Sequence, residues 1–271
     1  MRVEGDFADR KARELAAAER VNGPSLKRNR RRQKNSPAMP TLVQKLFNTC
    51  REIFSGVQAG VVPSPAGVER LRSVLDRMNP GDVGLNQSMP YFGSFGETEK
   101  PPPVTYLHLY ECEQFSIGIF CLPPSAVIPL HNHPGMTVFS KLLFGSMHVK
   151  SFDWLDGPPP DTEPGLAKVV MDAAFTAPCN TSILYPAAGG NIHCFTAVTA
   201  CAVLDVLGPP YSDDCTYYNE LPCANISSGD SALAAEEGET QGRVWLEQRE
   251  KKPDDFVVVG GKYRGPRIVV R

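Results

Sequence analysis

The sequence predicts a mainly-β fold, an antiparallel sandwich or barrel that is preceded by two α-helices. From about residue 104 onward, apolar residues alternate with a period of two, and Gly or Pro turns separate the segments. Before residue 80, apolar residues recur instead with a helical period. Hydrophobic residues make up 42% of the 271 residues, which is enough to form a core. Eight or more short strands without intervening helices favour two packed sheets or a barrel.

The two helices are expected within residues 40–80. Thr41 can cap the first helix, and Gly56 can end it. Ser64 can cap the second, with Pro65 at its first position and an Asn-Pro-Gly stop at residues 79–81. Each segment has one apolar face, so the pattern indicates a packed helical pair without chemistry of its own.

The strands follow the helices within one domain that we expect to span residues 40–271. The predicted strands are Val104–Cys112, Gln114–Leu122, Met136–Phe144, Met147–Trp154, Ala167–Met171, Thr181–Tyr185, Asn191–Thr196 and Ala200–Leu207. Residues 225–251 are acidic and contain Gly and Ser, so we expect an inserted loop there. The strand pattern returns at Phe256–Val259 and again at residues 268–270.

Residues 1–39 are expected to form a disordered basic arm. They carry 11 Lys and Arg against 5 Asp and Glu, whereas residues 40–271 carry 17 against 25. Residues 27–34 place six positive charges in eight positions, which repel one another and resist folding. The run is typical of a nuclear-import signal or of a solubilising tail. We do not expect sequence-specific DNA binding from it.

The cysteine pattern indicates a reducing compartment. The eight cysteines are scattered without a CxxC pair, and the charged start lacks the apolar stretch of a secretory signal. Free thiols are therefore expected, and a four-cysteine zinc site is not. We expect no membrane-spanning helix, because no apolar run approaches ~18 residues.

The strongest chemical signal is the pair His131 and His133. Two histidines at positions i and i+2 of a strand point to the same face, so both imidazoles can reach one metal ion. His193 lies on a later predicted strand after a Gly-Gly turn, and a barrel can bring that strand close to the first two histidines. The alternative is two surface histidines beside a turn and one core histidine. The set of three favours metal binding.

These residues resemble the two histidine motifs of the cupins. His131 and His133 match the start of the first motif, with Gly145 in place and Val138 where the motif has a glutamate. His193 matches the histidine of the second motif. Longer stretches at 131–154, 185–193, 204–211 and 255–257 resemble the plant cysteine oxidases, which are relatives of animal cysteamine dioxygenase. The resemblance covers about residues 40–271.

The resemblance implies a cupin barrel, a double-stranded β-helix or jelly roll, that holds Fe(II) through His131, His133 and His193. Because no carboxylate ligand is present, a substrate thiolate can balance the charge of the metal. The family adds both atoms of O2 to the N-terminal cysteine of proteins, chiefly group VII ethylene-response transcription factors. The cysteine sulfinic acid leads to their degradation by the N-degron pathway, which makes the enzyme an oxygen sensor in the hypoxia response. We expect a monomer in nucleus and cytoplasm, without nucleic-acid or membrane partners.

Four further residues are candidates for the site. Asp205 lies among apolar residues of a predicted strand, where a buried carboxylate must be paired or functional, unless it faces solvent. By the resemblance, Asp205 orients substrate or bound water, and Tyr211 lines the pocket, unless it is an ordinary interface aromatic. Cys215 and Tyr217 resemble the place where the animal relative can form a Cys–Tyr crosslink, although a free buried cysteine is the simpler expectation.

Two other functions stay open from the sequence. The same iron chemistry can act on a small thiol, such as free cysteine or cysteamine. The other function is that of a catalytically silent cupin that serves as a nuclear interaction module. The three histidines and Asp205 argue against this second function. His108 and His148 are expected to be structural.

Overall fold

The computed structural model describes residues 39–93, 101–160, 163–209, 215–221 and 242–270. Within this part, the helical elements are α1 (Leu42–Phe54), α2 (Pro65–Leu75) and the 3-10 turns η1 (Pro80–Val83) and η2 (Pro90–Phe92). The strands are β1 (Val104–Glu111), β2 (Ser116–Leu122), β3 (Val127–His131), β4 (Thr137–Phe144), β5 (Ser146–Trp154), β6 (Gly165–Thr176), β7 (Ser182–Leu184), β8 (Ile192–Ala197), β9 (Cys201–Gly208), β10 (Tyr218–Leu221), β11 (Arg243–Gln248) and β12 (Val258–Gly261).

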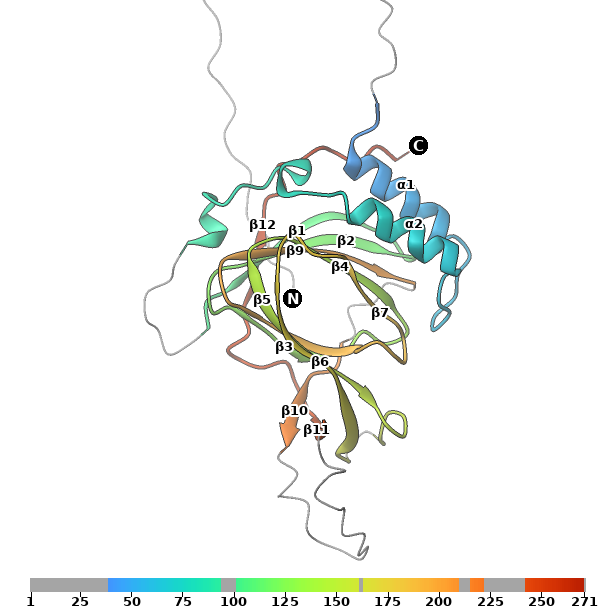
Figure 1. Ribbon diagram of the computed structural model, residues 1–271, viewed down its shortest axis with the longest axis vertical. Coiled ribbons are helices and arrows are strands. Elements are labelled where there is room, and N and C mark those ends of the chain that lie inside the picture. Colours follow the sequence, from blue (N-terminus) through green and yellow to red (C-terminus); the bar gives the residue numbers. More distant parts are fainter. Residues whose placement is uncertain (1–38, 94–100, 161–162, 210–214, 222–241, 271) are drawn as a thin grey trace, which may run out of the picture. The chain divides into compact units, whose positions relative to one another are not determined.

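The strands form two sheets whose order is that of a jelly roll. One sheet has the order β12-β1-β2-β9-β4-β7 and the other β10-β11-β6-β5-β8-β3. The central eight strands, β2 to β9, alternate between the sheets except at β5 and β6, which pair within the second sheet, as in a jelly roll. This confirms the predicted mainly-β barrel, which Figure 1 shows as a nearly closed ring. One pair departs from the expected antiparallel pattern, because β1 and β12 run parallel.

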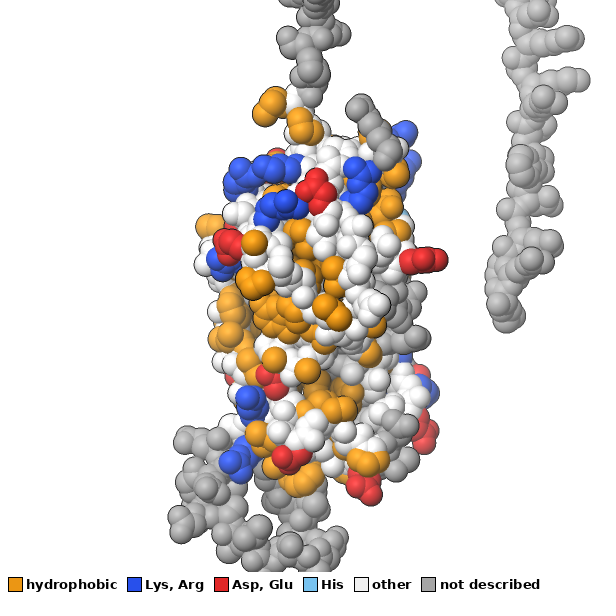
Figure 2. Space-filling view, turned by 90° about the vertical axis from the view of Figure 1, so that its right-hand side faces the viewer, with side chains coloured by type: hydrophobic (Ala, Val, Ile, Leu, Met, Phe, Trp, Pro, Cys, Tyr) orange, Lys and Arg blue, Asp and Glu red, His pale blue; other side chains and the backbone are white. Residues whose placement is uncertain are grey.

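The two helices lie on the outer face of the first sheet, and their predicted starts are confirmed. The Thr41 and Ser64 side chains each accept a hydrogen bond from the amide three residues later, at 3.2 Å. Buried helix residues such as Phe47 and Leu71 share one core with β2 and β9. Figure 2 shows the face with α2 and β7: hydrophobic side chains gather over its middle, and Lys and Arg gather at the top.

A second core fills the space between the two sheets. It contains Leu122, Leu142 and Val203 from the first sheet and Met147 and Phe195 from the second. Along β2, β4 and β9 of the first sheet, side chains alternate between this inner core and the outer core beneath the helices. Inward-facing positions at one end of the barrel are therefore available for a site.

Three strands were not predicted from the sequence. β3 contains Pro129, which cannot donate to a ladder, and its pairing with β8 is irregular between Ile128 and His131. β10 and β11 form a hairpin that extends the second sheet. The expectation of a loop over 225–251 is therefore wrong for Arg243–Gln248, because the alternating apolar residues there pair with β6. Residues 222–241 lie outside the described residues.

Most other predicted strands are present in the structure but differ in length from the prediction. β6 is longer than predicted, because its exposed second half still pairs with β5. The predicted strand at 268–270 is irregular in the structure.

The basic arm over residues 1–38 lies outside the described residues, so that prediction stays open. In the described part of the chain, we find no helix of the length and apolarity that a membrane crossing requires.

Candidate metal centre

The three predicted histidines converge at one end of the barrel. β3 ends at His131, which lies opposite His193 of β8 in the register of the second sheet. The prediction that His133 shares this strand is wrong, because the chain turns after His131, with Gly135 at a φ of +69°. Even so, the three side chains place their potential ligand atoms within 4.8 Å of one another. One metal ion can contact all three.

Backbone carbonyls fix the orientation of two of the rings. The Nδ1 atom of His131 lies 2.8 Å from the carbonyl oxygen of Pro129, and that of His193 lies 3.0 Å from the carbonyl oxygen of Asn191. A carbonyl only accepts hydrogen bonds, so both Nδ1 atoms carry the proton. The Nε2 lone pairs are then free for a metal, as in metal sites whose histidines donate their other N–H to the protein.

Burial keeps these imidazoles neutral. Desolvation lowers the pKa of His131 and of His133, and it lowers the pKa of His193 to about 3. Mutual repulsion of the charged rings lowers the pKa of His133 and His193 further. Neutral imidazole is the form that binds metals, and it is typical of iron, copper, nickel and zinc sites. The donor set fits Fe(II).

The Asn191 side chain joins the two histidine-bearing segments. Its Oδ1 accepts a hydrogen bond from the His133 amide at 2.8 Å, and its Nδ2 donates to the His133 carbonyl at 3.1 Å and the Tyr185 carbonyl at 2.9 Å. Asn191 is buried and also supplies the carbonyl that orients His193. The sequence interpretation missed this residue. Its position two residues before His193, directly after Gly-Gly, was the available signal.

The turn before Asn191 is itself held in place. Gly189 and Gly190 have φ angles of +79° and +80°, a backbone conformation that other residues rarely adopt. Their amides donate to the Asp153 carboxylate at the end of β5, at 3.1 and 2.8 Å. Three segments that are distant in sequence are thus hydrogen-bonded around the metal centre.

Asn132 attaches residues 215–218 to the site. Its Oδ1 accepts from the Thr216 amide at 2.8 Å, and its Nδ2 donates to the Tyr218 hydroxyl at 3.1 Å. The ring of Tyr217 lies 6.1 Å from that of His131 between centroids. Burial, and after it the neighbouring Cys215 thiol, raises the pKa of Tyr217. Cys215 is a free, half-buried cysteine beside Tyr217, less buried than expected.

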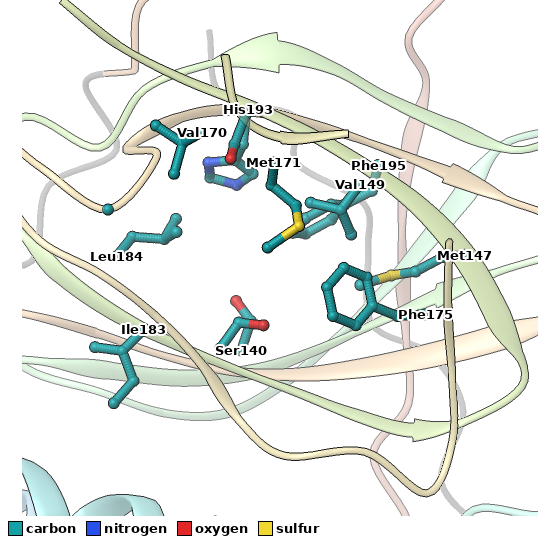
Figure 3. Close-up of a pocket in the computed structure, with 13 residues that line it drawn as sticks. Ser140, Met147, Val149, Val170, Met171, Phe175, Ile183, Leu184, His193 and Phe195 are labelled. Carbon is teal, nitrogen blue, oxygen red and sulfur yellow. The ribbon is translucent and has the colours of Figure 1, made fainter. Parts of the chain in front are cut away.

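A cavity in the barrel interior extends from His193 (Figure 3). It has a volume of about 210 Å³ and is mainly apolar, with Met147 and Phe175 among its walls. Ser140 of β4 lies across the cavity from His193. The cavity therefore places mainly apolar side chains beside the metal centre.

Asp205 faces the same interior. It is the register partner of Ser140, and direct partners on neighbouring strands project to the same face of a sheet. Asp205 is only 6% exposed, so the alternative of a solvent-facing position is wrong. Burial raises its pKa to about 7, while the Ser140 hydroxyl opposes this shift. Among the described residues its Oδ1 has no hydrogen-bond partner, although the atom is buried.

The remaining candidates lie elsewhere. Tyr211 lies outside the described residues, so its role stays a prediction. His108 and His148 lie on the barrel surface near carboxylates, with His148 Nε2 2.9 Å from Asp172 and His108 Nδ1 3.9 Å from Glu111. Neither belongs to the histidine cluster.

The chain is similar in sequence to known thiol dioxygenases. The chain is 57% identical to plant cysteine oxidase 1 of Arabidopsis thaliana over 248 residues, which cover 88% of this chain and 85% of the relative. It is 31% identical to 2-aminoethanethiol dioxygenase of Mus musculus over 264 residues, which cover 85% of this chain and 98% of that relative. An RmlC-like cupin protein from Desulfovibrio desulfuricans overlaps 44% of this chain and 99% of its own, with 19% identity and a TM-score of 0.29. The model of the PCO_ADO family matches residues 74–268, and the chain therefore belongs to this family, the group of thiol dioxygenases to which the named relatives belong.

Proposed function

We propose that this protein is an Fe(II)-dependent dioxygenase that converts the N-terminal cysteine of target proteins to cysteine sulfinic acid. The observation that carries the proposal is the cluster of three neutral imidazoles, without a carboxylate, at the edge of a mainly apolar cavity. Fe(II) held by His131, His133 and His193 would supply a redox centre at which a thiolate and O2 react. The negative thiolate would balance the charge that three neutral ligands leave on the metal.

The protein's own residues would orient the substrate. The unpartnered Oδ1 of Asp205 can accept a hydrogen bond from the α-amine of a cysteine whose sulfur lies at the metal. With a pKa raised to about 7, Asp205 can hold or release a proton near neutral pH. The apolar walls of the cavity exclude water and so strengthen this contact. Tyr211 is proposed to line the same pocket.

The biological role that we propose is oxygen sensing. Sulfinic acid is generally an irreversible oxidation state of cysteine, which suits a degradation signal. The proposed targets are group VII ethylene-response transcription factors, which oxidation would direct to the N-degron pathway and which low oxygen would spare. The 57% identity to two plant cysteine oxidases supports this choice. We further propose a monomer that acts in nucleus and cytoplasm.

A small thiol is the second candidate substrate. The relatives that are 30–31% identical carry the name 2-aminoethanethiol dioxygenase, which favours a small amine-bearing thiol. Both candidates share a thiol and an amine, so the metal centre alone does not separate them.

One experiment separates the candidates. The iron-loaded protein is mixed with a Cys-initiated peptide, free cysteine or cysteamine, in air and in nitrogen, and the masses of the products are measured. We expect the peptide to gain two oxygen atoms only in air, and a Ser-initiated peptide to gain none. Faster oxidation of the small thiols would favour the second candidate. If no substrate gains oxygen although iron is bound, both enzyme functions are wrong, and the silent interaction module is the remaining explanation.

A further inference from the structure

A groove on the rim of the barrel lies beside the metal centre, and we propose that it binds an apolar side chain of a peptide substrate a few residues after the N-terminal cysteine. This inference rests on the proposed function and adds a sequence preference to it. The groove has a volume of about 460 Å³. Its apolar walls are Pro134, Phe152, Trp154, Pro158, Pro186 and Ile192.

The groove shares its walls with the segments that bear the histidines. Asn132, which separates His131 from His133, lines it, and so does Asn191, two residues before His193. β3 ends, β8 begins and β5 ends at this groove, so it lies at the same end of the barrel as the metal centre. An extended peptide advances roughly 3.3–3.6 Å per residue. Ser151 and His193 face the interior, whereas their neighbours Phe152 and Ile192 line the groove, so the groove lies on the other face of the sheet. A substrate whose cysteine occupies the centre would pass over the rim, and its third to fifth residues are the ones that we propose to enter the groove.

The polar groups of the groove are already satisfied. The Asn191 amide binds the backbone of His133 and Tyr185, and the Asn132 amide binds Thr216 and Tyr218. The Asp153 carboxylate accepts the amides of the Gly-Gly turn. The Asp153 carboxylate disfavours an acidic side chain, and most of the remaining wall is apolar, so we expect an apolar side chain to fit best. The aromatic and aliphatic surface that remains gives such a side chain its contact area.

The geometry also separates peptides from small thiols. Free cysteine and cysteamine have no atoms beyond the amine-bearing segment, so they cannot occupy the centre and the groove together. Phe152 forms a buried part of the wall, whereas Pro134, Pro158 and Ala187 are exposed, which leaves the groove open to solvent. A volume of this size lies within the range of about 300–1,000 Å³ that is typical of ligand sites.

Two neighbouring alanines provide a matched test. Ala187 lines the groove, whereas Ala188 is equally exposed but does not line it. Decapeptides with an N-terminal cysteine followed by glycines are compared with variants that carry one leucine at position 3, 4 or 5, and kcat/KM is measured. We expect the natural protein to prefer one leucine peptide by about tenfold, the scale of one pocket contact. Ala187→Trp should reduce this ratio to about one, and Ala188→Trp should preserve it. No leucine preference at any position, or equal loss in both variants, would overturn the proposal.

A binding measurement keeps the test independent of catalysis. The chain has two tryptophans, Trp154 in the groove and Trp245 in β11, so Trp245→Phe leaves Trp154 as the fluorescent probe. Ser-initiated leucine peptides, which cannot be oxidised at sulfur, should change the Trp154 emission, and the all-glycine peptide should do so only at higher concentration. If the protein oxidises no thiol but shows this difference, the proposed function fails while the groove stands. Equal responses to both peptides would overturn the groove whatever the activity.

Discussion

At the scale of single residues, the metal centre depends on positioning groups as much as on its ligands. His131, His133 and His193 could be selected from the sequence because their spacing and the Gly-Gly turn have a direct geometric meaning. For Asn191, the sequence offered only its position beside His193, because its hydrogen bonds to His133 join segments 58 residues apart, which only the fold brings together. Asp205 was a candidate because of its apolar neighbours, yet its open acceptor atom emerges only from the packing.

Asn191→Ala is expected to weaken metal binding about 10- to 100-fold, the usual effect of losing a group that orients a metal ligand. The physical reason is that the His133 backbone would lose two hydrogen bonds that set its distance from His193. Competition with a chelator measures the affinity. Asn86→Ala is the control, because Asn86 is an exposed residue whose side chain accepts hydrogen bonds from the neighbouring Ser88, away from the histidines. Unchanged affinity in Asn191→Ala would exclude the positioning role.

Asp205→Asn is expected to change how stability depends on pH in the metal-free protein. Because the folded pKa of Asp205 is about 7, above the usual 3.8, the folded state binds the proton more tightly. The stabilisation of the folded state by this proton is complete below pH ~4 and is lost as the pH rises to ~7. It amounts to roughly 4 kcal/mol, because each pKa unit corresponds to ~1.4 kcal/mol. The three histidines of the metal centre, whose folded pKa values are lowered, have the opposite slope.

The comparison therefore uses the difference between the natural protein and Asp205→Asn, in which the histidine contribution cancels. Urea unfolding at pH 4, 5, 6 and 7 gives the free energies. We expect the advantage of the natural protein over the variant to shrink as the pH rises. A difference that stays constant with pH would show that Asp205 is not the buried, proton-holding carboxyl described above.

At the scale of elements, the helices and strands with clear local sequence signals were the most predictable. The starts of α1 and α2 follow from caps within three residues, and the strands with clean alternation were placed to within a few residues. The histidine pair was expected on a strand, but β3 was not among the strands placed, and its irregular ladder around Pro129 is defined only by the long-range pairing with β8. β11 was missed because its acidic surroundings indicated a loop, whereas its pairing with β6 is long-range.

The Gly-Gly turn offers a test at this scale. Gly190 has a φ of +80°, and an added Cβ would meet the Ser151 side chain. Gly157 has a φ of +84° but nothing within 4 Å of an added Cβ. Gly157→Ala should therefore cost only the backbone strain, roughly 1 kcal/mol, whereas Gly190→Ala should cost about 2–4 kcal/mol in total. Equal losses of unfolding free energy in the two variants would contradict the packing described for this turn.

At the scale of the whole molecule, the jelly roll places ligands from separate strands at one end of a rigid barrel. The order of its strands could be predicted only as a barrel or sandwich, because periodicity does not specify which strands pair. The topology brings β3 and β8 together as neighbours and places β9, with Asp205, on the facing sheet. Metal binding should accordingly stabilise the entire domain.

Thermal unfolding in the presence of Fe(II) under nitrogen tests this coupling. A metal that binds only the folded state adds about 2.7 kcal/mol when its concentration is 100 times the dissociation constant. The melting temperature of the natural protein should therefore rise with added metal, and that of His193→Ala should rise much less. His148→Ala, on the barrel surface, should respond like the natural protein. The same rise in all three proteins would indicate metal binding elsewhere.

The most direct test of the central claim is the origin of the oxygen atoms in the product. The iron-loaded protein is given a Cys-initiated peptide in an atmosphere of oxygen-18 gas, and the mass of the peptide is measured. We expect both atoms added to the N-terminal sulfur to come from the gas, and His193→Ala to add none. Product oxygen that comes from water, or labelled product formed equally by His193→Ala, would contradict a dioxygenase built on the three-histidine centre.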